Sequence, residues 1–342
     1  MSELDRYIRQ TLFAPLGEAG QLKLLSSSVL LVGCGALGSH VADRLVRAGV
    51  GRLVIVDRDY IELSNLQRQA LFDEDDIEAG LPKSIAAAEK LRRINSQVEI
   101  EPRVADVNYT NIEELLEGIQ LVMDGSDNFE TRYLINDACV KHHLPWIYGG
   151  SIANYGMTMT IRPYQTACLR CLFPEAPPPG SAPTCDTVGV LNAVPATIAA
   201  IQSSEAIKLL AGVSQLNPGL IHIDLWENTF ETLKVARRVD TCPACGSASG
   251  GFEYLEGREG AQATLLCGRD AVQIRVLPAR PLSLPRLAQR LQFAGDVSFN
   301  EFLLRLRVDS YEITVFPDAR AIVKGTDDEA LAKSLYSKFI GD

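Results

Sequence analysis

The first two thirds of the chain alternate between short apolar runs and longer stretches with helical periodicity. The apolar run at residues 29–32 predicts a strand, the stretch SHVADRLVRAG predicts a helix, and the run LVIVD ending at Asp57 predicts a second strand. The helical stretches PKSIAAAEKLRRIN and FETRYLINDACVKHH then separate the strand-like runs VEIEP, LVMDG and PWIYGGS. Because strands joined by helices pair in parallel, we expect an α/β fold with a doubly wound, mostly parallel, Rossmann-like sheet.

This alternation stops at residues 173–186. Their sequence, FPEAPPPGSAPTCD, is too rich in proline for a regular helix or a central strand, so we expect an exposed connection, the crossing loop. A helical stretch, VPATIAAIQSSEAIKLLAG, follows and is expected to end at Gly212. The runs LIHIDLWE and TFETLKVARR resemble paired antiparallel strands, so the sheet should gain an antiparallel extension.

The last ninety or so residues have a different pattern. AVQIRVLP is strand-like, LPRLAQRLQ is helical, and FLLRLRVDSYEITVFPDARAIVKG alternates as antiparallel strands before a closing helix. The Ser/Gly run at residues 247–251 is the expected domain boundary. We therefore predict two domains, residues 1–250 and a small C-terminal α+β domain at residues 251–342.

Composition narrows the classes of partner. The chain has 342 residues, with 33 Lys and Arg against 43 Asp and Glu and a net charge of -10, so neither nucleic acid nor a membrane surface is expected as a partner. The N-terminal segment is charged where a signal peptide needs an apolar stretch, and no apolar run approaches the roughly 20 residues of a membrane span. We expect a cytoplasmic protein.

A glycine-rich loop follows the first predicted strand. Gly33, Gly35 and Gly38 form Gly-x-Gly-x-x-Gly directly before a helix, a pattern that lets the backbone approach a phosphate at the helix N-terminus. Asp57 ends the next strand, where a carboxylate can accept hydrogen bonds from ribose hydroxyls. The alternative is a tight turn needed only for packing. The loop predicts a nucleotide site but does not separate a dinucleotide from ATP.

Polar residues downstream favour ATP. Asn65, Arg68 and Lys83 supply an amide and two cations suited to a polyphosphate, and Asp127, after a strand, can ligate Mg²⁺. Taken singly, Arg68 or Lys83 could equally be a solvated surface charge. The chain has no Gly-x-x-x-x-Gly-Lys-Ser/Thr motif, so it lacks the phosphate-binding loop of a P-loop kinase or ATPase. A reaction at the α-phosphate of ATP, with pyrophosphate as the leaving group, remains open.

Two Cys-x-x-Cys pairs predict a structural metal site. Cys168, Cys171, Cys242 and Cys245 are enough for a closed tetrahedral Zn²⁺ site that joins two distant segments. Redox pairs or unliganded thiols are the alternatives. Four thiolates leave no open coordination position, so this metal should not be catalytic.

The other cysteines differ in their surroundings. Cys185 ends the crossing loop just before a helix, where a thiol can have a lowered pKa and act as a nucleophile, although an inert loop cysteine fits as well. Cys34, Cys139 and Cys267 lie in apolar surroundings and are interpreted as packing residues.

Together these motifs resemble the MoeB/ThiF/HesA family, relatives of ubiquitin-activating enzymes that include the molybdopterin-synthase adenylyltransferase type. The resemblance extends from about Arg6 to Gly246 and includes RYIRQ, GCGALGS, VDRDYIELSNLQRQ, Lys83, DGSDN, Cys185 and the two cysteine pairs. It implies that ATP and Mg²⁺ adenylylate the C-terminal Gly-Gly carboxylate of a ubiquitin-like sulfur carrier, which prepares formation of a thiocarboxylate. Family members serve molybdenum-cofactor, thiamin and tRNA thiolation pathways, so the sequence does not identify the carrier.

The same resemblance assigns roles residue by residue. The positions that match the family's ATP-binding residues are Ala36, Asp57, Asp59, Asn65, Arg68, Lys83, Asp127 and Asn128. Ala36 stands in the glycine loop at a position where members of this family commonly have a further glycine. Arg9 resembles an arginine that reaches the phosphates of the other protomer's ATP, which implies a homodimer. Cys185 matches a crossover-loop cysteine that in some members bonds covalently to the carrier or its sulfur.

The C-terminal region lacks a cysteine-centred loop like that of a rhodanese domain, so a separate sulfur donor is expected.

Two other functions stay open at this point. An NAD-dependent oxidoreductase with the same glycine loop is the main rival function, and a non-catalytic dimeric scaffold is the third possibility. The cations and Asp127 argue against both.

Overall fold

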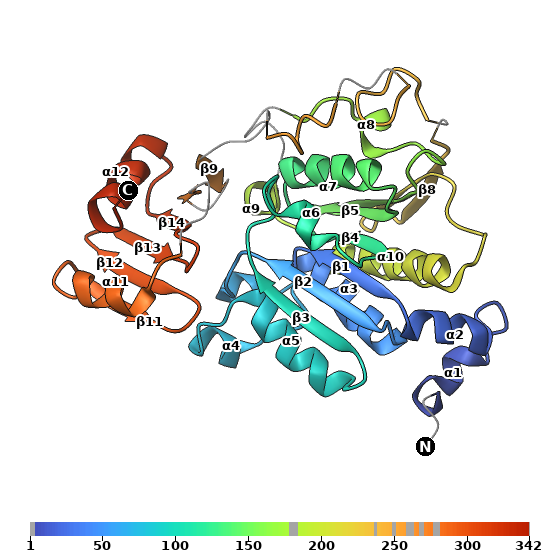
Figure 1. Cartoon of the computed structure of the whole chain (residues 1–342), viewed down its shortest axis with the longest axis horizontal. Helices are drawn as coiled ribbons and strands as arrows, with labels where there is room; N and C mark the ends of the chain where they lie inside the picture. The colour runs from blue at the N-terminus through green and yellow to red at the C-terminus, as the bar shows by residue number, and fades with distance from the viewer. Residues whose placement is uncertain are drawn as a thin grey trace. The chain divides into compact units, whose positions relative to one another are not determined.

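The computed structural model describes residues 4–177, 184–235, 238–247, 251–257, 263–266, 270–275 and 281–341. The chain forms two compact units (Figure 1): one comprises Met1–Pro177 and Val190–Glu259, the other Pro178–Gly189 and Gly260–Asp342. Residues 251–257 group with the first unit, where Leu255 is buried in the core. Residues 248–250 lie outside the described residues, and the boundary between residues 250 and 251 stays a prediction.

The first unit is built on an eight-stranded sheet with the order β3-β2-β1-β4-β5-β6-β7-β8. Strands β1 to β5 pair in parallel, and β6, β7 and β8 continue the sheet antiparallel. This confirms the doubly wound sheet and its antiparallel extension. The strands are β1 (Ser28–Val32), β2 (Arg52–Asp57), β3 (Glu99–Val104), β4 (Leu121–Asp124), β5 (Trp146–Ile152), β6 (Tyr155–Ile161), β7 (Leu220–Asp224) and β8 (Thr229–Leu233).

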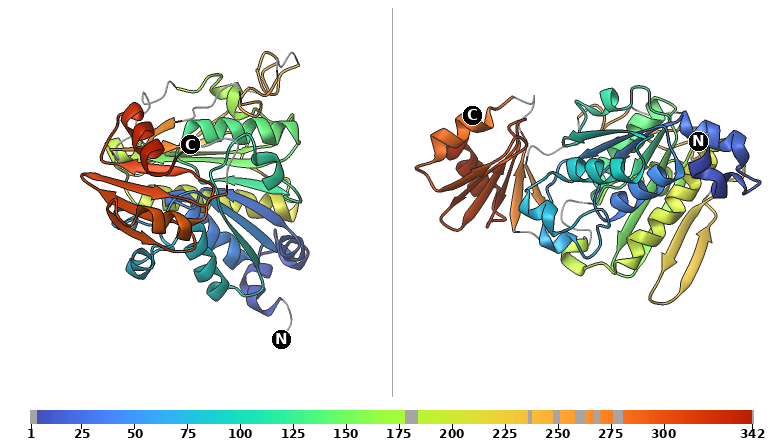
Figure 2. Two further views of the ribbon diagram at one scale, coloured as in Figure 1. Left: turned by 60° about the vertical axis from the view of Figure 1, so that its left-hand side comes forward. Right: turned by 90° about the horizontal axis from the view of Figure 1, so that it is seen from below.

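Helices cover both faces of this sheet (Figures 1 and 2). Val29 and Leu31 of β1 face a core shared with α3, α5 and α10, whereas Leu30 and Val32 face a core shared with α6 and α7. Burial on both faces explains why β1 is a continuous apolar run rather than an alternating one. The helices of this unit are η1 (Asp5–Tyr7), α1 (Ile8–Thr11), α2 (Gly17–Leu25), α3 (Ala36–Ala48), η2 (Leu63–Asn65), α4 (Glu74–Glu78), α5 (Lys83–Ile94), α6 (Ile112–Leu115), α7 (Phe129–Lys141), α8 (Leu169–Leu172) and α10 (Ala193–Ala211).

The second unit is a six-stranded antiparallel sheet with the order β11-β12-β13-β14-β10-β9. Its core is formed by one face of the sheet and the apolar sides of α11 and α12. The small α+β domain expected from the sequence is thereby confirmed. Its elements are α9 (Cys185–Val188), β9 (Ala263–Leu266), β10 (Ala271–Ile274), α11 (Leu284–Leu291), β11 (Asp296–Phe299), β12 (Leu304–Val308), β13 (Tyr311–Val315), β14 (Ala321–Lys324) and α12 (Glu329–Phe339).

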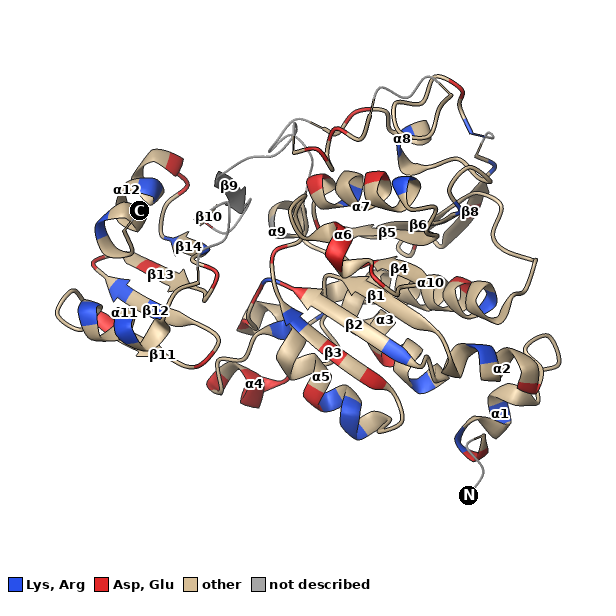
Figure 3. Cartoon of the chain, viewed as in Figure 1, with Lys and Arg blue, Asp and Glu red and all other residues tan. Residues whose placement is uncertain are grey.

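Charged side chains of both signs are distributed over both units (Figure 3). Acidic residues gather on short helices such as α4, which carries Glu74, Asp75 and Asp76. Within the described residues, no helix combines the length and the apolar character that a membrane span requires. Because the surface carries charges of both signs, an anionic ligand must be held by a few well-placed cations and N–H groups rather than by a basic surface.

Candidate functional site

The glycine loop lies where the strand order reverses, between the carboxyl ends of β1 and β4. In open α/β sheets this is the position at which ligands bind. Gly33 has a φ of +87°, and a Cβ there would lie 2.6 Å from the carbonyl oxygen of Gly125, which follows β4. A Cβ on Gly38, in the first turn of α3, would lie 1.9 Å from the carbonyl oxygen of Gly33. These two glycines are therefore required for packing.

Gly35 differs from the other two glycines of the motif. A Cβ there would meet only Nε2 of Gln69, at an ordinary contact distance of 3.7 Å. Gly35 is the N-cap residue of α3, no side chain caps the helix there, and Ala36 is its first residue. Packing does not explain this glycine, whereas a bound phosphate at the start of the 13-residue helix would.

Gly38→Ala and Gly35→Ala provide a matched pair of tests. Gly38→Ala should lower the free energy of unfolding by about 1–3 kcal/mol because the methyl group overlaps the Gly33 carbonyl. Gly35→Ala should leave thermal stability nearly unchanged and weaken ATP binding. Calorimetric melting and ATP titration measure the two effects, and an unchanged ATP affinity in Gly35→Ala would contradict the assignment of Gly35.

Asp57 joins the glycine loop to the end of β2. Its Oδ2 accepts a 2.6 Å hydrogen bond from the N–H of Cys34, and its Oδ1 accepts one of 2.7 Å from the N–H of Asp59. Burial raises the pKa of the Asp57 carboxyl, and the nearby Lys83 ammonium opposes that rise. Each carboxylate oxygen can accept a further hydrogen bond, as binding of ribose hydroxyls requires.

Lys83 and Asp59 form an ion pair beside Asp57. The Lys83 Nζ lies 3.3 Å from Asp59 Oδ2, and the lysine side chain is only 4% exposed. Lys83 is the first residue of α5, an unfavourable place for a cation because of the helix dipole. A buried lysine in that place needs a negative partner, and the structure brings the acids Asp57 and Asp59 to it. The sequence predicted these three residues for a nucleotide site but not their mutual pairing.

Asn65 and Arg68 lie on the segment that follows β2 and passes the start of α3. Asn65 is buried, and its Oδ1 accepts a 3.1 Å hydrogen bond from the N–H of Glu62, while Arg68 donates a 2.8 Å bond to the Ser64 carbonyl. The N–H of Ala70 donates to Ser39 Oγ of α3. This segment is therefore adjacent to the first turns of α3, and Arg68 belongs to it.

Gln69 was missed by the sequence analysis. It is 3% exposed, lies beside Gly35, and its Oε1 has no hydrogen-bond partner among the described residues. A buried amide oxygen without a partner is costly, so a donor on a bound ligand would stabilise it. The only signal in the sequence was its place at the end of SNLQRQ, beside residues already assigned.

Asp127 and Asn128 follow β4 at the same edge of the sheet. Asp127 is exposed. Asn128 is the N-cap residue of α7, where its Oδ1 accepts a 2.8 Å hydrogen bond from the N–H of Thr131, and its Nδ2 lies 3.4 Å from Asp127 Oδ1. Capping alone accounts for Asn128, and the cap also fixes the direction of the residue before it.

Arg132 was also missed. Its buried guanidinium lies 3.2 Å from Asp124 Oδ2 and donates hydrogen bonds of 2.8 Å to the Ser126 carbonyl and 3.1 Å to the Gly149 carbonyl. Burial lowers the pKa of Arg132, but the charges of Asp124 and Asp127, the Tyr148 hydroxyl and the hydrogen bond to Asp124 together raise the pKa above its ordinary value. An arginine in the first turn of a predicted helix was the available signal, because the helix dipole disfavours a cation there.

Arg58, directly after Asp57, is the third residue missed. Its Nη1 lies 2.9 Å from Asp106 Oδ1, and its Nε lies 3.9 Å from Asp59 Oδ1. The guanidinium thus balances acids that follow β2 and β3, next to the expected nucleotide position.

Arg9 is not brought to this edge of the sheet in its own chain. Arg9 is exposed and belongs to α1, the helix labelled in Figure 1. The neighbouring Tyr7 accepts a 2.9 Å hydrogen bond from Asn95 Nδ2. The ring of Tyr7 also packs at Gly49, three residues before β2 begins. The segment carrying Arg9 therefore lies at the amino ends of β1 and β2, opposite the glycine loop.

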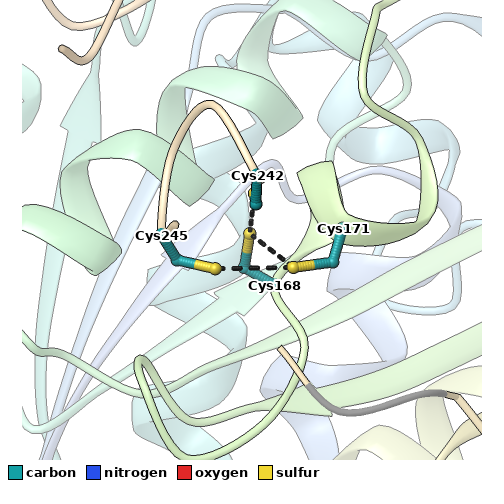
Figure 4. Close-up of side chains that lie close together, drawn as sticks. All are labelled: Cys168, Cys171, Cys242 and Cys245. Atoms are coloured by element: carbon teal, nitrogen blue, oxygen red, sulfur yellow. Dashed lines mark hydrogen bonds between the residues drawn. The ribbon is translucent and has the colours of Figure 1, made fainter. Parts of the chain in front are cut away.

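The four paired cysteines converge as predicted (Figure 4). Their sulfur atoms lie within 4.8 Å of one another, with separations of 3.8 Å for Cys168 and Cys171, 3.6 Å for Cys168 and Cys242, and 3.4 Å for Cys171 and Cys245. Sulfurs bound tetrahedrally to Zn²⁺ at about 2.3 Å are roughly 3.8 Å apart. The described cysteines form no disulfide, so this donor set fits a structural zinc ion.

Cys34 and Cys139 agree with their interpretation as packing residues, whereas the role of Cys185 stays a prediction. Cys34 and Cys139 are fully buried, and burial raises the pKa of both thiols. Cys185 is half-buried at the first residue of α9, in the second unit. Cys267 lies outside the described residues.

The fold is a doubly wound α/β sheet with a glycine loop at its switch point and four converging cysteines that could hold a metal ion. Comparison with known proteins identifies the family. The ThiF family model matches residues 7–244, so the chain belongs to the ThiF family.

Two curated relatives and a solved structure are similar to this chain. The "Sulfur carrier protein ThiS adenylyltransferase" of Bacillus subtilis is 44% identical over 98% of this chain and 99% of the relative. The "Sulfur carrier protein adenylyltransferase" of Thermus thermophilus is 40% identical over 71% of this chain and 91% of the relative. A crystal structure of E. coli MccB with AMPCPP and MccA superposes with a TM-score of 0.62 at 25% identity, covering 72% of this chain and 75% of that chain.

Proposed function

We propose that this protein uses ATP and Mg²⁺ to adenylylate the C-terminal Gly-Gly carboxylate of a ubiquitin-like sulfur carrier, with release of pyrophosphate. The observation that carries the proposal is the set of polar groups at the carboxyl ends of β1, β2 and β4, together with similarity to two sulfur-carrier adenylyltransferases. The comparisons give no support to an NAD-dependent oxidoreductase or to a non-catalytic scaffold.

The site residues divide the work of holding ATP. Asp57 would bind the ribose hydroxyls, and the uncapped start of α3 with Arg68 and Lys83 would hold the phosphates. The buried Gln69 Oε1 offers an acceptor for a donor of the nucleotide. Mg²⁺ held by Asp127 would neutralise charge on the leaving pyrophosphate.

The reaction depends on the orientation of the carrier carboxylate and the triphosphate more than on a strong base. A carboxylate oxygen of the carrier attacks the α-phosphorus, a P–O bond forms, and the bond from the α-phosphorus to the bridging oxygen breaks. Pyrophosphate leaves with that electron pair, and the carrier becomes an acyl adenylate. Cations that meet the phosphates before the reaction supply most of the catalysis by positioning and charge stabilisation.

A homodimer would complete the site with Arg9. Because Arg9 lies at the amino ends of the strands, it would act on the nucleotide of a second protomer rather than its own. The exposed apolar side chains around Arg9 support this proposal, because a second protomer would bury them. They are Ile8, Leu12, Phe13 and Leu22, each more than half exposed.

Sulfur would come from a separate protein. The only cysteine of the sequence after Cys245 is Cys267, which precedes AVQIRVLP rather than lying in a cysteine-centred loop like that of a rhodanese domain. Cys185 would bond covalently to the carrier after adenylylation, and the four-cysteine site would hold a structural zinc ion.

Carrier-dependent ATP–pyrophosphate exchange tests the proposed function. Exchange should require both the purified protein and a ubiquitin-like carrier that ends in Gly-Gly, and deletion of the two glycines should remove it. NADH absorbance with candidate alcohols tests the oxidoreductase alternative. Absence of exchange with every sulfur carrier of the source cell would refute the proposal.

Cys185→Ala should separate the two halves of the reaction. We expect ATP–pyrophosphate exchange to stay within about twofold of the unmodified protein, because the thiol is not needed for attack on phosphorus. Covalent linkage to the carrier, measured by intact mass, should be lost. Loss of exchange in a folded Cys185→Ala protein would contradict this separation.

A further inference from the structure

Arg170 lies between two of the zinc-site cysteines and links three segments of the first unit. Its side chain, on α8, is 5% exposed. Its Nη2 lies 2.9 Å from Glu253 Oε2, and its Nε donates a 3.3 Å hydrogen bond to the Pro174 carbonyl. Its Nη1 lies 3.8 Å from Oδ1 of Asp137 on α7, within ion-pair range but too far for a hydrogen bond.

Tyr254 completes the cluster. Its N–H donates a 3.2 Å hydrogen bond to Asp137 Oδ2, and the Arg170 guanidinium lies over its ring, 5.6 Å from the ring centroid. Its ring centroid is 5.0 Å from that of Tyr133 on α7. We name this cluster the Arg170 clamp; its members are Asp137, Arg170, Glu253 and Tyr254.

The clamp holds both segments through which the chain leaves the first unit. One is residues 173–177, where Arg170 bonds Pro174 and the Tyr133 hydroxyl lies 2.8 Å from two further carbonyl oxygens, those of Phe173 and Glu175. After Pro177 the chain enters the second unit and reaches Cys185. The other is residues 251–257, which contain Glu253 and Tyr254 and precede the second crossing, after Glu259.

A buried arginine is a costly way to fill this space. Replacing a buried ion pair with apolar side chains is often neutral or stabilising, so stability alone does not account for the clamp. A planar guanidinium with several donors can instead fix the relative directions of three backbone segments, which an aliphatic side chain does not do.

We propose that Arg170 is a positioning residue for the step after adenylylation, because it fixes the bases of both segments that lead into the unit containing Cys185. The inference rests on the proposed function. In that step the Cys185 thiol attacks the carbonyl carbon of the acyl adenylate. A C–S bond forms, the C–O bond to AMP breaks, AMP leaves with the electron pair, and the thiol proton passes to water.

The first test needs no carrier. Hydrogen exchange followed by mass spectrometry compares the zinc-loaded full chain with Arg170→Met, Arg170→Lys and the control Arg47→Met, which removes an exposed arginine of α3. In Arg170→Met, peptides covering residues 173–177 and 251–257 should exchange on the order of tenfold faster, with zinc content and exchange of α3 unchanged. Arg170→Lys should be intermediate. Unchanged exchange at both segments, or loss of zinc, would overturn the clamp.

The second test follows the two chemical steps. In Arg170→Met, kcat and KM of ATP–pyrophosphate exchange should stay within about twofold. The single-turnover rate of Cys185 bond formation should fall about tenfold or more, with partial recovery in Arg170→Lys. Equal loss in both steps would mean a general structural defect and overturn the positioning role, as would an unchanged second step. If the unmodified protein shows no exchange, the proposed function fails, and the hydrogen-exchange arm still decides on the clamp.

Discussion

Asp127→Ala is expected to lower carrier-dependent ATP–pyrophosphate exchange by about 1,000-fold or more. The side chain follows β4 at the carboxyl edge of the sheet, close to the glycine loop, where a carboxylate can hold Mg²⁺ against the phosphates. Because Asp127 is exposed, its loss should change the free energy of unfolding by less than about 0.5 kcal/mol. Exchange assays and thermal melting measure the two effects.

Two further variants make that result specific. Asp127→Asn keeps the shape and removes the charge, so it should lose nearly as much activity as Asp127→Ala. Asp43→Ala removes a carboxylate from the middle of α3, where it pairs with Arg47, and should leave exchange unchanged. Near-normal exchange in folded Asp127→Ala would refute the assigned metal role.

Loss of the four-cysteine site should have the largest effect on stability. The purified protein should contain about one zinc ion per chain. The double variant Cys168→Ser/Cys242→Ser should contain no zinc. Structural zinc contributes folding free energy directly, so we expect the melting temperature to fall by roughly 10 °C or more. Metal analysis and calorimetry provide the measurements.

The structural reason lies in which segments the site joins. Cys168 is the N-cap residue of α8, Cys171 lies within α8, and Cys242 and Cys245 belong to residues 238–247. The ion would therefore connect segments on either side of the crossing loop and α10. Cys185→Ala serves as the control and should retain full zinc. A metal-free protein with unchanged stability would contradict the structural role.

Features encoded by local pattern were predicted correctly from the sequence. The run at residues 29–32, the glycine loop and Asp57 follow one another along the chain, so their strand–loop–helix geometry could be deduced from adjacency. The cysteine cluster was also found, because two Cys-x-x-Cys pairs supply the four soft ligands that suit one metal ion.

Features that depend on distant partners were missed. Arg170 contacts Glu253, 83 residues later, and nothing in the local sequence of either predicts the pair. Arg132 contacts the carbonyl groups of Ser126, after β4, and Gly149, within β5. Gln69 is significant only because folding buries it beside Gly35. Such roles follow from the three-dimensional neighbours rather than from residue type or spacing.

Arg9 illustrates a residue whose role was available only by resemblance. Nothing in RYIRQ indicates contact with a phosphate, and the structure places Arg9 at the amino ends of the strands, away from the glycine loop of its own chain. A role at a nucleotide therefore requires a second protomer, which mixing Arg9→Ala and Asp127→Ala proteins can test by restoring exchange in the mixed dimer.

The central claim is that ATP binds across the carboxyl ends of β1 and β4 with its α-phosphorus open to a carrier tail. A crystal structure of the protein with a non-hydrolysable ATP analogue and a Gly-Gly carrier tests it most directly. The account predicts ribose density at Asp57, phosphate density at the start of α3, and the terminal carboxylate facing the α-phosphorus. Adenosine bound elsewhere, or that edge of the sheet blocked by protein, would contradict it.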